Sequence, residues 1–198
     1  MNKDIIKEYG DVLHDPSSII DRPLEILSVG PKLDIALGGG VPEGSLFIMT
    51  GPEKVGKTVT ALTFCANAQK HYDRKIYYAN IEGRLKKRDL EGIMDLSLDS
   101  EKMQIIGSTE GNILSAEKYL SIVDNIVHTQ PGSLAVVDSF SALSSEAELT
   151  GDLSDMQVMS VQKILAKFCR RISNVLPINR VTVIGITHLM ANMQRFGR

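Results

Sequence analysis

SLFIMTGPEKVGKT, residues 45–58, is the most informative stretch of this chain. The apolar run 45–50 predicts a buried strand, and the periodic stretch 57–71 predicts a helix. Between them, Gly51 to Thr58 match the pattern GxxxxGK[ST]. A strand, a glycine-containing loop and a helix in this order are the context in which that pattern binds phosphate. A chance glycine-rich turn is therefore a poor explanation.

The residue types of the loop predict an ATP and Mg²⁺ site. Glycines allow backbone N–H groups to converge on a phosphate, and the start of the helix adds a positive partial charge. We expect Lys57 to act in catalysis through the outer phosphates, and the Thr58 hydroxyl to ligate Mg²⁺. The residues expected to bind the nucleotide are Gly51, Pro52, Glu53, Lys54, Val55, Gly56, Lys57, Thr58 and Val59.

Outward from the loop, apolar strands alternate with helices. Further strands are predicted over 75–82, 103–107, 133–139 and 181–188, and amphipathic helices over 112–130 and 155–176. Ile113 and Val127 are expected on the buried face of the first of these helices. Strands that are apolar almost throughout indicate a mainly parallel sheet with helices on both faces, so the sequence predicts a single-domain α/β fold.

Three polar side chains stand where predicted strands end: Glu82, Asp138 and His188. The carboxyl ends of parallel strands face the ligand in open α/β sheets. We expect Asp138 to hold Mg²⁺ through its water shell, and Glu82 to polarise a water for attack on the γ-phosphate. His188, which follows Thr187, is expected to hydrogen-bond the γ-phosphate.

Each of the three has a plainer interpretation. Asp138 could cap the next turn with Ser139, and His188 could be a satisfied, partly buried histidine. Glu82 could be a surface glutamate paired with Arg84 or Lys86, and its position alone favours neither interpretation.

Composition sets broad limits. The chain has 198 residues, 43% of them hydrophobic, and a net charge of −2, which excludes an intrinsically disordered chain. Its cysteines, Cys65 and Cys169, form no CxxC pair and are expected to be buried free thiols in a reducing compartment. No apolar run approaches a membrane span, and the first 20 residues do not resemble a secretory signal. We therefore expect a cytoplasmic protein without membrane contact.

Charge is distributed unevenly along the chain. Residues 156–198 contain seven Lys and Arg and no Asp or Glu, whereas the other 155 residues carry 15 basic and 24 acidic side chains, a net charge of −9. A basic end on an acidic body suits nucleic-acid contact. The alternative is a solvated helix face that is rich in Lys and Arg.

Three stretches together resemble the RecA family of recombinases, including its phage-type members. They are LDIALG with GPEKVGKT (within 28–58), AVVDSFSAL (135–143) and EAELTGDLSDMQ (146–157). The resemblance runs from about Ser28 to the end. It implies a P-loop NTPase fold with a RecA-like core, DNA-dependent ATPase activity, single-stranded DNA as a partner, and a homo-oligomeric helical filament that serves recombination and DNA repair.

The resemblance also implies roles for single residues. Glu82 aligns with the family's catalytic glutamate. His188 aligns with a glutamine that senses the γ-phosphate in bacterial members. Lys163 matches a DNA-contacting position on the helix after the first DNA-binding loop, 148–157. Residues 189–198 correspond to the second DNA-binding loop, where Arg195 is an expected DNA contact and Phe196 is the one aromatic that could stack on a base.

The chain departs from the family in two places. No aromatic follows Glu82 in GRLKKRDLEG, where the family stacks one on adenine, and Asp89 or a basic residue is expected to border the base instead. The family core also continues beyond the point where this sequence stops. Two segments are expected in this single domain: an extension over 1–30, with a helix at 3–14, that mediates oligomerisation, and an ATPase core over 31–198 that ends at the second DNA loop.

Two other functions remain open. One is a nucleotide-binding regulatory relative, or a module that caps a filament, without strand exchange of its own. The other is a hexameric helicase or clock-type ATPase, which lacks the LDIALG and AELTGD patterns. For a phage-encoded protein, the expected location is the host cytoplasm.

Overall fold

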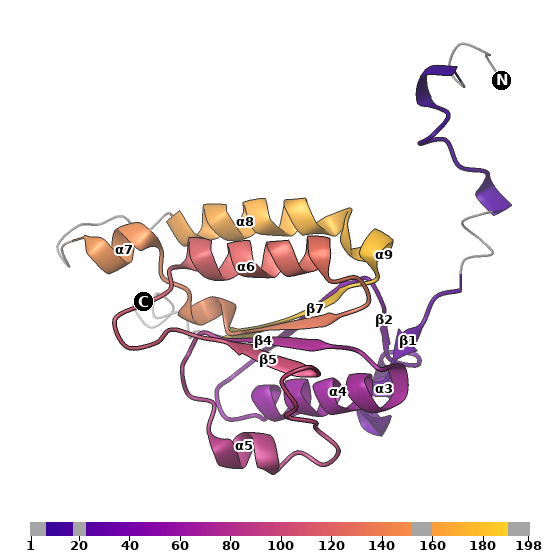
Figure 1. The fold of residues 1–198 in the computed structure, drawn as a ribbon. Helices are drawn as coiled ribbons and strands as arrows, with labels where there is room; N and C mark the ends of the chain where they lie inside the picture. Colours follow the sequence, from indigo (N-terminus) through magenta and orange to yellow (C-terminus); the bar gives the residue numbers. More distant parts are fainter. Residues whose placement is uncertain (1–6, 18–22, 152–159, 190–198) are drawn as a thin grey trace, which may run out of the picture.

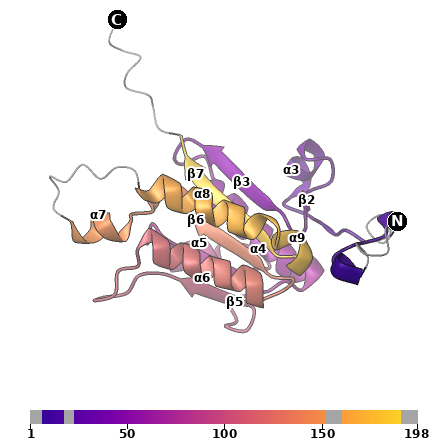
Figure 2. The ribbon, with the colours of Figure 1, turned by 90° about the horizontal axis from the view of Figure 1, so that it is seen from above.

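A five-stranded parallel sheet forms the centre of the molecule (Figures 1 and 2). The computed structural model describes residues 7–17, 23–151 and 160–189. The strands of the sheet are β3 (Leu46–Gly51), β4 (Ile76–Asn80), β5 (Met103–Ile106), β6 (Leu134–Asp138) and β7 (Thr182–His188). They lie in the order β3-β7-β6-β4-β5, and every neighbouring pair is parallel. The predicted α/β class and the predicted strands are confirmed.

Helices cover both faces of the sheet. On one face lie α6 (Ala116–Thr129), α8 (Ser160–Ser173) and the short α9 (Leu176–Asn179); on the other lie α4 (Lys57–Tyr72) and α5 (Lys87–Glu91) (Figure 1). Two further short helices are η1 (Phe140–Ala142) and α7 (Glu146–Thr150). An antiparallel pair, β1 (Ile26–Leu27) and β2 (Val41–Pro42), encloses α3 (Pro31–Ala36), the helix of the LDIALG stretch.

Two apolar cores result from the alternation of side chains along the strands. On β4, Tyr77 contributes to the core beneath α6 and α8, whereas Tyr78 contributes to the core against α4. Both are almost fully buried. The central strands β4 and β6 have helices on both sides and almost no solvent-facing position, which is why their sequences are apolar almost throughout.

The helix predicted over 112–130 begins later than expected. Ser115 is its N-cap and accepts a hydrogen bond from the N–H of Lys118. Ile113 therefore lies outside the helix, and it is 72% exposed rather than buried. Val127 is fully buried, as expected. A cap of this kind gives a partner to a backbone N–H of the first helical turn that would otherwise have none. This local bond sets the start of the helix, although the apolar spacing begins earlier.

The helix predicted over 155–176 is divided. Within the described residues, α8 ends at Ser173 and α9 starts at Leu176, with Pro177 in its first turn. Proline is tolerated in a first turn but cannot continue a helix from before it. Residues 152–159 lie outside the described part of the chain.

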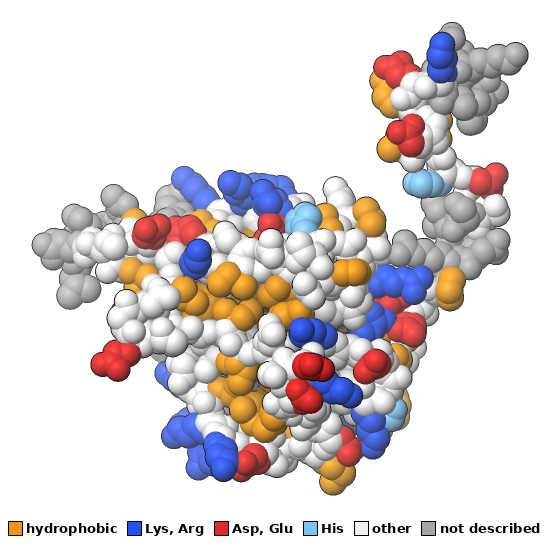
Figure 3. Space-filling model, in the orientation of Figure 1, with side chains coloured by type: hydrophobic (Ala, Val, Ile, Leu, Met, Phe, Trp, Pro, Cys, Tyr) orange, Lys and Arg blue, Asp and Glu red, His pale blue; other side chains and the backbone are white. Residues whose placement is uncertain are grey.

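The N-terminal segment stands apart from the sheet and its helices (Figures 1 and 3). Residues 7–9 are helical and a turn follows, so the described part of the predicted helix 3–14 is shorter than expected. Residues 1–6 and 18–22 lie outside the description. Tyr9, Val12 and Leu13 are 49%, 67% and 42% exposed. Among the described helices, none has the length and apolar character needed to cross a membrane.

Candidate active site

The phosphate-binding motif forms the turn between β3 and α4. β3 ends at Gly51 and α4 begins at Lys57. Gly56 takes a left-handed conformation, with φ of 92°, that suits a residue without a side chain. Lys57 Nζ donates to the backbone carbonyls of Gly51, at 2.8 Å, and Pro52, at 2.6 Å. The ammonium is therefore held over the loop by neutral groups, with no carboxylate partner among the described residues.

The Thr58 hydroxyl lies beside Asp138. Thr58 Oγ1 donates to Asp138 Oδ2 at 2.9 Å, and the Tyr78 hydroxyl donates to the same oxygen at 2.6 Å. Asp138 is only 7% exposed. Burial, together with the adjacent Asp138 carboxylate, raises the pKa of Tyr78, so this hydroxyl remains a donor at any physiological pH. The two oxygen-bearing groups expected at Mg²⁺ are thus next to each other.

Glu82 follows β4 and has both of its carboxylate oxygens close to partners. Its Oε1 accepts from the Ser139 hydroxyl at 2.7 Å and lies 2.7 Å from His188 Nε2. Its Oε2 lies 3.5 Å from an Arg84 guanidinium nitrogen. Burial alone would raise the pKa of Glu82, but the bonds from Ser139 and His188 and the nearby positive charges lower it below the ordinary 4.5. Glu82 is therefore ionised at neutral pH.

His188 joins the end of β7 to the turn after β6. Its backbone N–H donates to Ser141 Oγ at 2.9 Å, and that hydroxyl lies 3.2 Å from Thr187 Oγ1. In the described part of the chain, His188 Nδ1 is buried without a hydrogen-bond partner. The next residue, Leu189, donates its N–H to the Gly51 carbonyl at 3.2 Å. The end of β7 is thus connected directly to the phosphate-binding loop.

A pocket of about 420 Å³ opens beside Glu82 and His188. Its walls come from one residue of the phosphate-binding loop and from residues at or shortly after the ends of β4, β6 and β7, whereas Lys57, Thr58 and Asp138 do not line it. Its lining residues are Glu53, Ile81, Glu82, Arg84, Ser141, Ala142, His188 and Leu189. No aromatic side chain is among them, in keeping with the missing aromatic after Glu82.

The chain matches the model of the RecA N-terminal domain over residues 3–195. It belongs to the RecA family. It is 30% identical to the mitochondrial DNA repair protein recA homolog 3 of Arabidopsis thaliana, over 95% of this chain and 42% of that protein. It is 34% identical to Protein RecA of Streptomyces venezuelae, over 85% of this chain and 43% of that protein. It is 31% identical to Protein RecA of Phytoplasma mali, over 98% of this chain and 56% of that protein.

The chain spans about half the length, or less, of these RecA relatives. The predicted membership of the RecA family is confirmed. The structure, in turn, groups Lys57, Thr58, Glu82, Asp138 and His188 at one edge of the sheet, as their places at strand ends predict. Their individual roles stay predictions.

Of the expected DNA-contacting residues, the structure describes Lys163, which does not line the pocket beside Glu82. Lys163 is exposed on α8, where Lys and Arg side chains gather at the top of the view in Figure 3. Arg195 and Phe196 lie outside the described residues. The expected loop 148–157 is wrong in its first residues, because α7 extends to Thr150. Its N-cap is Ser145, whose capping box with Glu148 favours a helix there.

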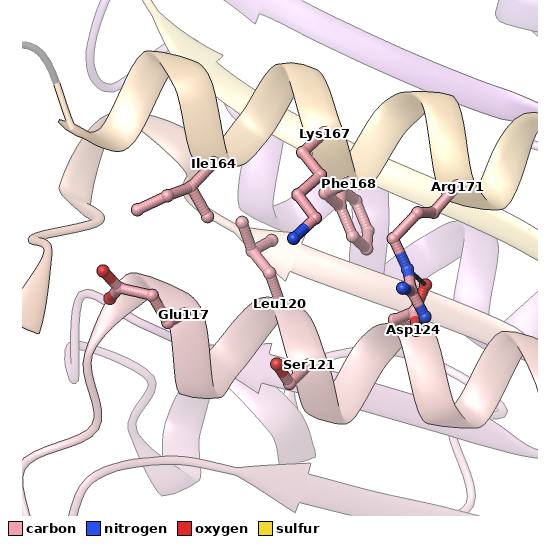
Figure 4. Close-up of a pocket in the computed structure, with 8 residues that line it drawn as sticks. All are labelled: Glu117, Leu120, Ser121, Asp124, Ile164, Lys167, Phe168 and Arg171. Atoms are coloured by element: carbon pink, nitrogen blue, oxygen red, sulfur yellow. Dashed lines mark hydrogen bonds and ion pairs between the residues drawn. The ribbon is translucent and has the colours of Figure 1, made fainter.

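A second hollow, of about 290 Å³, lies between α6 and α8 (Figure 4). Leu120, Ile164 and Phe168 provide its apolar side chains, and Arg171 closes one end by a double hydrogen bond to Asp124 at 3.1 and 2.7 Å. It shares no lining residue with the pocket beside Glu82 and His188.

Sequence reasoning missed three hydroxyl groups of the site: Tyr78, Ser139 and Ser141. A tyrosine in an otherwise apolar buried strand was one available signal, since its hydroxyl needs a partner. The two serines of Asp-Ser-Phe-Ser, directly after a buried strand, were another.

Proposed function

We propose that the chain is the ATP-hydrolysing, single-stranded-DNA-binding core of a RecA-type recombinase. One observation carries this: the phosphate-binding loop, a hydroxyl–carboxylate pair and an ionised glutamate bonded to a histidine lie at one edge of the sheet, and the glutamate and the histidine line a pocket there. Each of these groups comes from a different strand end or its turn. The arrangement supplies a phosphate cradle, metal-ligating oxygens and a base for water.

The residues present fit a Mg²⁺–ATP complex. Lys57 is held by carbonyls that a phosphate can replace, and Thr58 and Asp138 present adjacent oxygen atoms. No group of three or more His, Cys, Asp and Glu in the described residues forms a metal site of its own, so phosphate and water oxygens would complete the ligand set. When bound, Mg²⁺ neutralises charge that develops on the phosphates.

Glu82 and His188 would act at the γ-phosphate. An ionised Glu82 orients and polarises the attacking water. His188 stands beside Glu82 and one residue before Leu189, where the segment resembling the second DNA loop begins. A contact from His188 to the γ-phosphate would therefore connect the nucleotide state to DNA affinity.

DNA contact is expected on the basic C-terminal part, through Lys163 on α8 and Arg195. Of the relatives, the Arabidopsis thaliana protein is named a DNA repair protein. A homo-oligomeric filament would place this surface on every subunit, with residues 1–30 as the connecting element.

Steady-state ATP hydrolysis, with and without single-stranded DNA, tests the proposal. We expect slow hydrolysis that requires Mg²⁺ and that DNA stimulates. ATP binding without turnover, at any DNA concentration, would favour the nucleotide-binding regulatory or filament-capping function. No nucleotide binding at all would contradict both.

A further inference from the structure

Ser139, the first residue after β6, is fully buried, and its hydroxyl is directed at Glu82. Its exposed fraction is 0%, and Oγ donates to Glu82 Oε1 at 2.7 Å. Ser139 is also the N-cap of η1, a position where a serine hydroxyl usually accepts a backbone hydrogen bond. It makes no such cap bond here. Within the described residues, the bond to Glu82 is the contact that this hydroxyl makes.

The two oxygens of Glu82 differ in their surroundings. Oε1 is shared by Ser139 and by His188 Nε2, each at 2.7 Å. An ionised carboxylate only accepts hydrogen bonds, so Nε2 carries the hydrogen. Among the described residues, Oε2 has only Arg84 nearby, at 3.5 Å, and that side chain is 79% exposed. Oε1 is therefore fully used, and Oε2 is the oxygen left for a water molecule.

The turn that carries Ser139 is fixed at its other side. Ser141 Oγ accepts the backbone N–H of His188 at 2.9 Å and lies 3.2 Å from Thr187 Oγ1. The turn is thus bonded to the ends of both β4 and β7, on either side of β6. The Ser139 hydroxyl has a set place relative to the pocket, whichever way the His188 ring turns.

We propose that Ser139 is a positioning residue for Glu82: it holds Oε1 so that Oε2 polarises the attacking water. The inference rests on the proposed ATPase function. In the reaction, the water oxygen bonds to the γ-phosphorus, and the bond from that phosphorus to the β–γ bridging oxygen breaks. A water proton passes to Oε2 and then to solvent, as ADP and phosphate leave. If the His188 ring moves to the γ-phosphate, Ser139 still holds the carboxylate.

Ser139→Ala and Ser133→Ala form a matched pair of variants. The two serines flank β6 at its opposite ends, and both are buried. Ser133 Oγ has no hydrogen-bond partner in the described structure, so its removal costs no bond. We expect Ser139→Ala to lower kcat about 10-fold through misplacement of Glu82, with the KM for ATP unchanged. Ser133→Ala is expected to keep the wild-type kcat.

Two further readouts separate positioning from a structural role. A carboxylate that loses a hydrogen bond has a higher pKa, so the acid limb of the kcat profile should move to higher pH in Ser139→Ala. In a Glu82→Gln background, Ser139→Ala should lower the rate little further, because both changes act on one group. Equal kcat in the two serine variants, an unmoved acid limb, or a full additional loss in the Glu82→Gln background would each overturn the inference.

A measurement without turnover separates this inference from the proposed function. The depressed pKa of Glu82 adds stability above its ordinary pKa of 4.5, and that stability is lost as pH falls through the lowered value. Denaturant unfolding should therefore show the deficit of Ser139→Ala shrinking as pH falls below 4.5, with a constant difference for Ser133→Ala. A wild-type chain that hydrolyses nothing contradicts the proposed function; identical pH dependence in the two variants contradicts the role of Ser139.

Discussion

Glu82 has contacts that fit both interpretations of its sequence position, a surface ion pair and a carboxylate inside the site. It lies near Arg84, as a surface glutamate would, yet its closer partners are Ser139 and His188 inside the site. The pair with Arg84 involves a mostly exposed side chain and contributes little. The hydrogen bonds inside the site determine the orientation and the ionised state of the carboxylate.

Glu82→Gln is expected to abolish most turnover while leaving nucleotide binding intact. The amide keeps the size of the side chain and can accept from Ser139, but it cannot take a proton from water. Turnover should fall about 100-fold or more. Steady-state kinetics and a fluorescent-nucleotide titration measure the two effects, with Glu117→Gln, in the separate hollow between α6 and α8, as a control. Wild-type turnover in Glu82→Gln would assign Glu82 to surface pairing alone.

At this scale the sequence predicts well the groups that stand in a motif or at a strand end, and poorly the hydroxyl groups of Tyr78 and Ser139. Lys57, Thr58 and Asp138 stand in a motif or at a strand end, where topology fixes their place. Tyr78 and Ser139 reach the site through side-chain direction and turn geometry. A sequence shows no periodic pattern for side-chain direction or for turn geometry. The places of these two hydroxyl groups therefore follow only from the structure.

Among the elements, Arg74 connects the β1–β2 pair to the body of the molecule. Its guanidinium is 8% exposed and donates to Glu25, to Glu43 at 2.6 Å, and to the carbonyl of Gly132 at 2.9 Å. Glu43 is itself 2% exposed and has Arg180 Nε 3.6 Å away. A buried charge network of this kind depends on all its members, because removal of one leaves another without its partner.

Arg74→Ala should therefore lower the free energy of unfolding by about 3 kcal/mol, since Glu43 would keep only longer contacts, with Arg180 at 3.6 Å and with the backbone N–H of Glu25 at 3.4 Å. Lys70→Ala, which breaks an ion pair with Asp95 between side chains about half exposed, should cost less than about 1 kcal/mol. Denaturant unfolding measures both. Equal losses of unfolding free energy in the two variants would show that burial does not make the Arg74 network more important for stability than an exposed ion pair.

Element boundaries were harder to predict than element types. The central strands appear where apolar runs place them, but α6 starts at its Ser115 cap and α8 stops before Pro177. Apolar spacing continued through both points. Capping bonds and the missing N–H of proline act locally and end a helix whose periodicity continues.

For the whole molecule, the N-terminal segment is expected to bind another copy of the chain. Tyr9, Val12 and Leu13 are exposed on a segment away from the core (Figure 3). Such apolar side chains gain stability only against a partner. Deletion of residues 1–22 should shift the protein toward monomer in sedimentation velocity, with the thermal transition of the body retained. A full chain that is monomeric with ATP and DNA present would contradict this.

DNA binding should be sensitive to salt and weakly selective for sequence, because the basic C-terminal part is proposed to contact phosphates. Lys163→Ala and Arg195→Ala should each weaken binding and reduce the slope of log K against log salt by about 0.7. Fluorescence anisotropy at several salt concentrations measures this, with Lys102→Ala as the control. Lys102 lies 3.9 Å from Asp73, at the start of β5. If neither substitution changes the DNA affinity or its salt dependence, this surface does not bind DNA.

We expect Mg²⁺–ATP to bind at Lys57, and both the proposed hydrolysis and the role of Ser139 depend on that binding. Lys57 and Lys70 stand near opposite ends of α4, so Lys57→Ala and Lys70→Ala remove the same charge from one helix at different places. Calorimetric titration with ATP and Mg²⁺ should show binding by the wild type and by Lys70→Ala, and none by Lys57→Ala. Unchanged ATP affinity in Lys57→Ala would contradict the proposed nucleotide site.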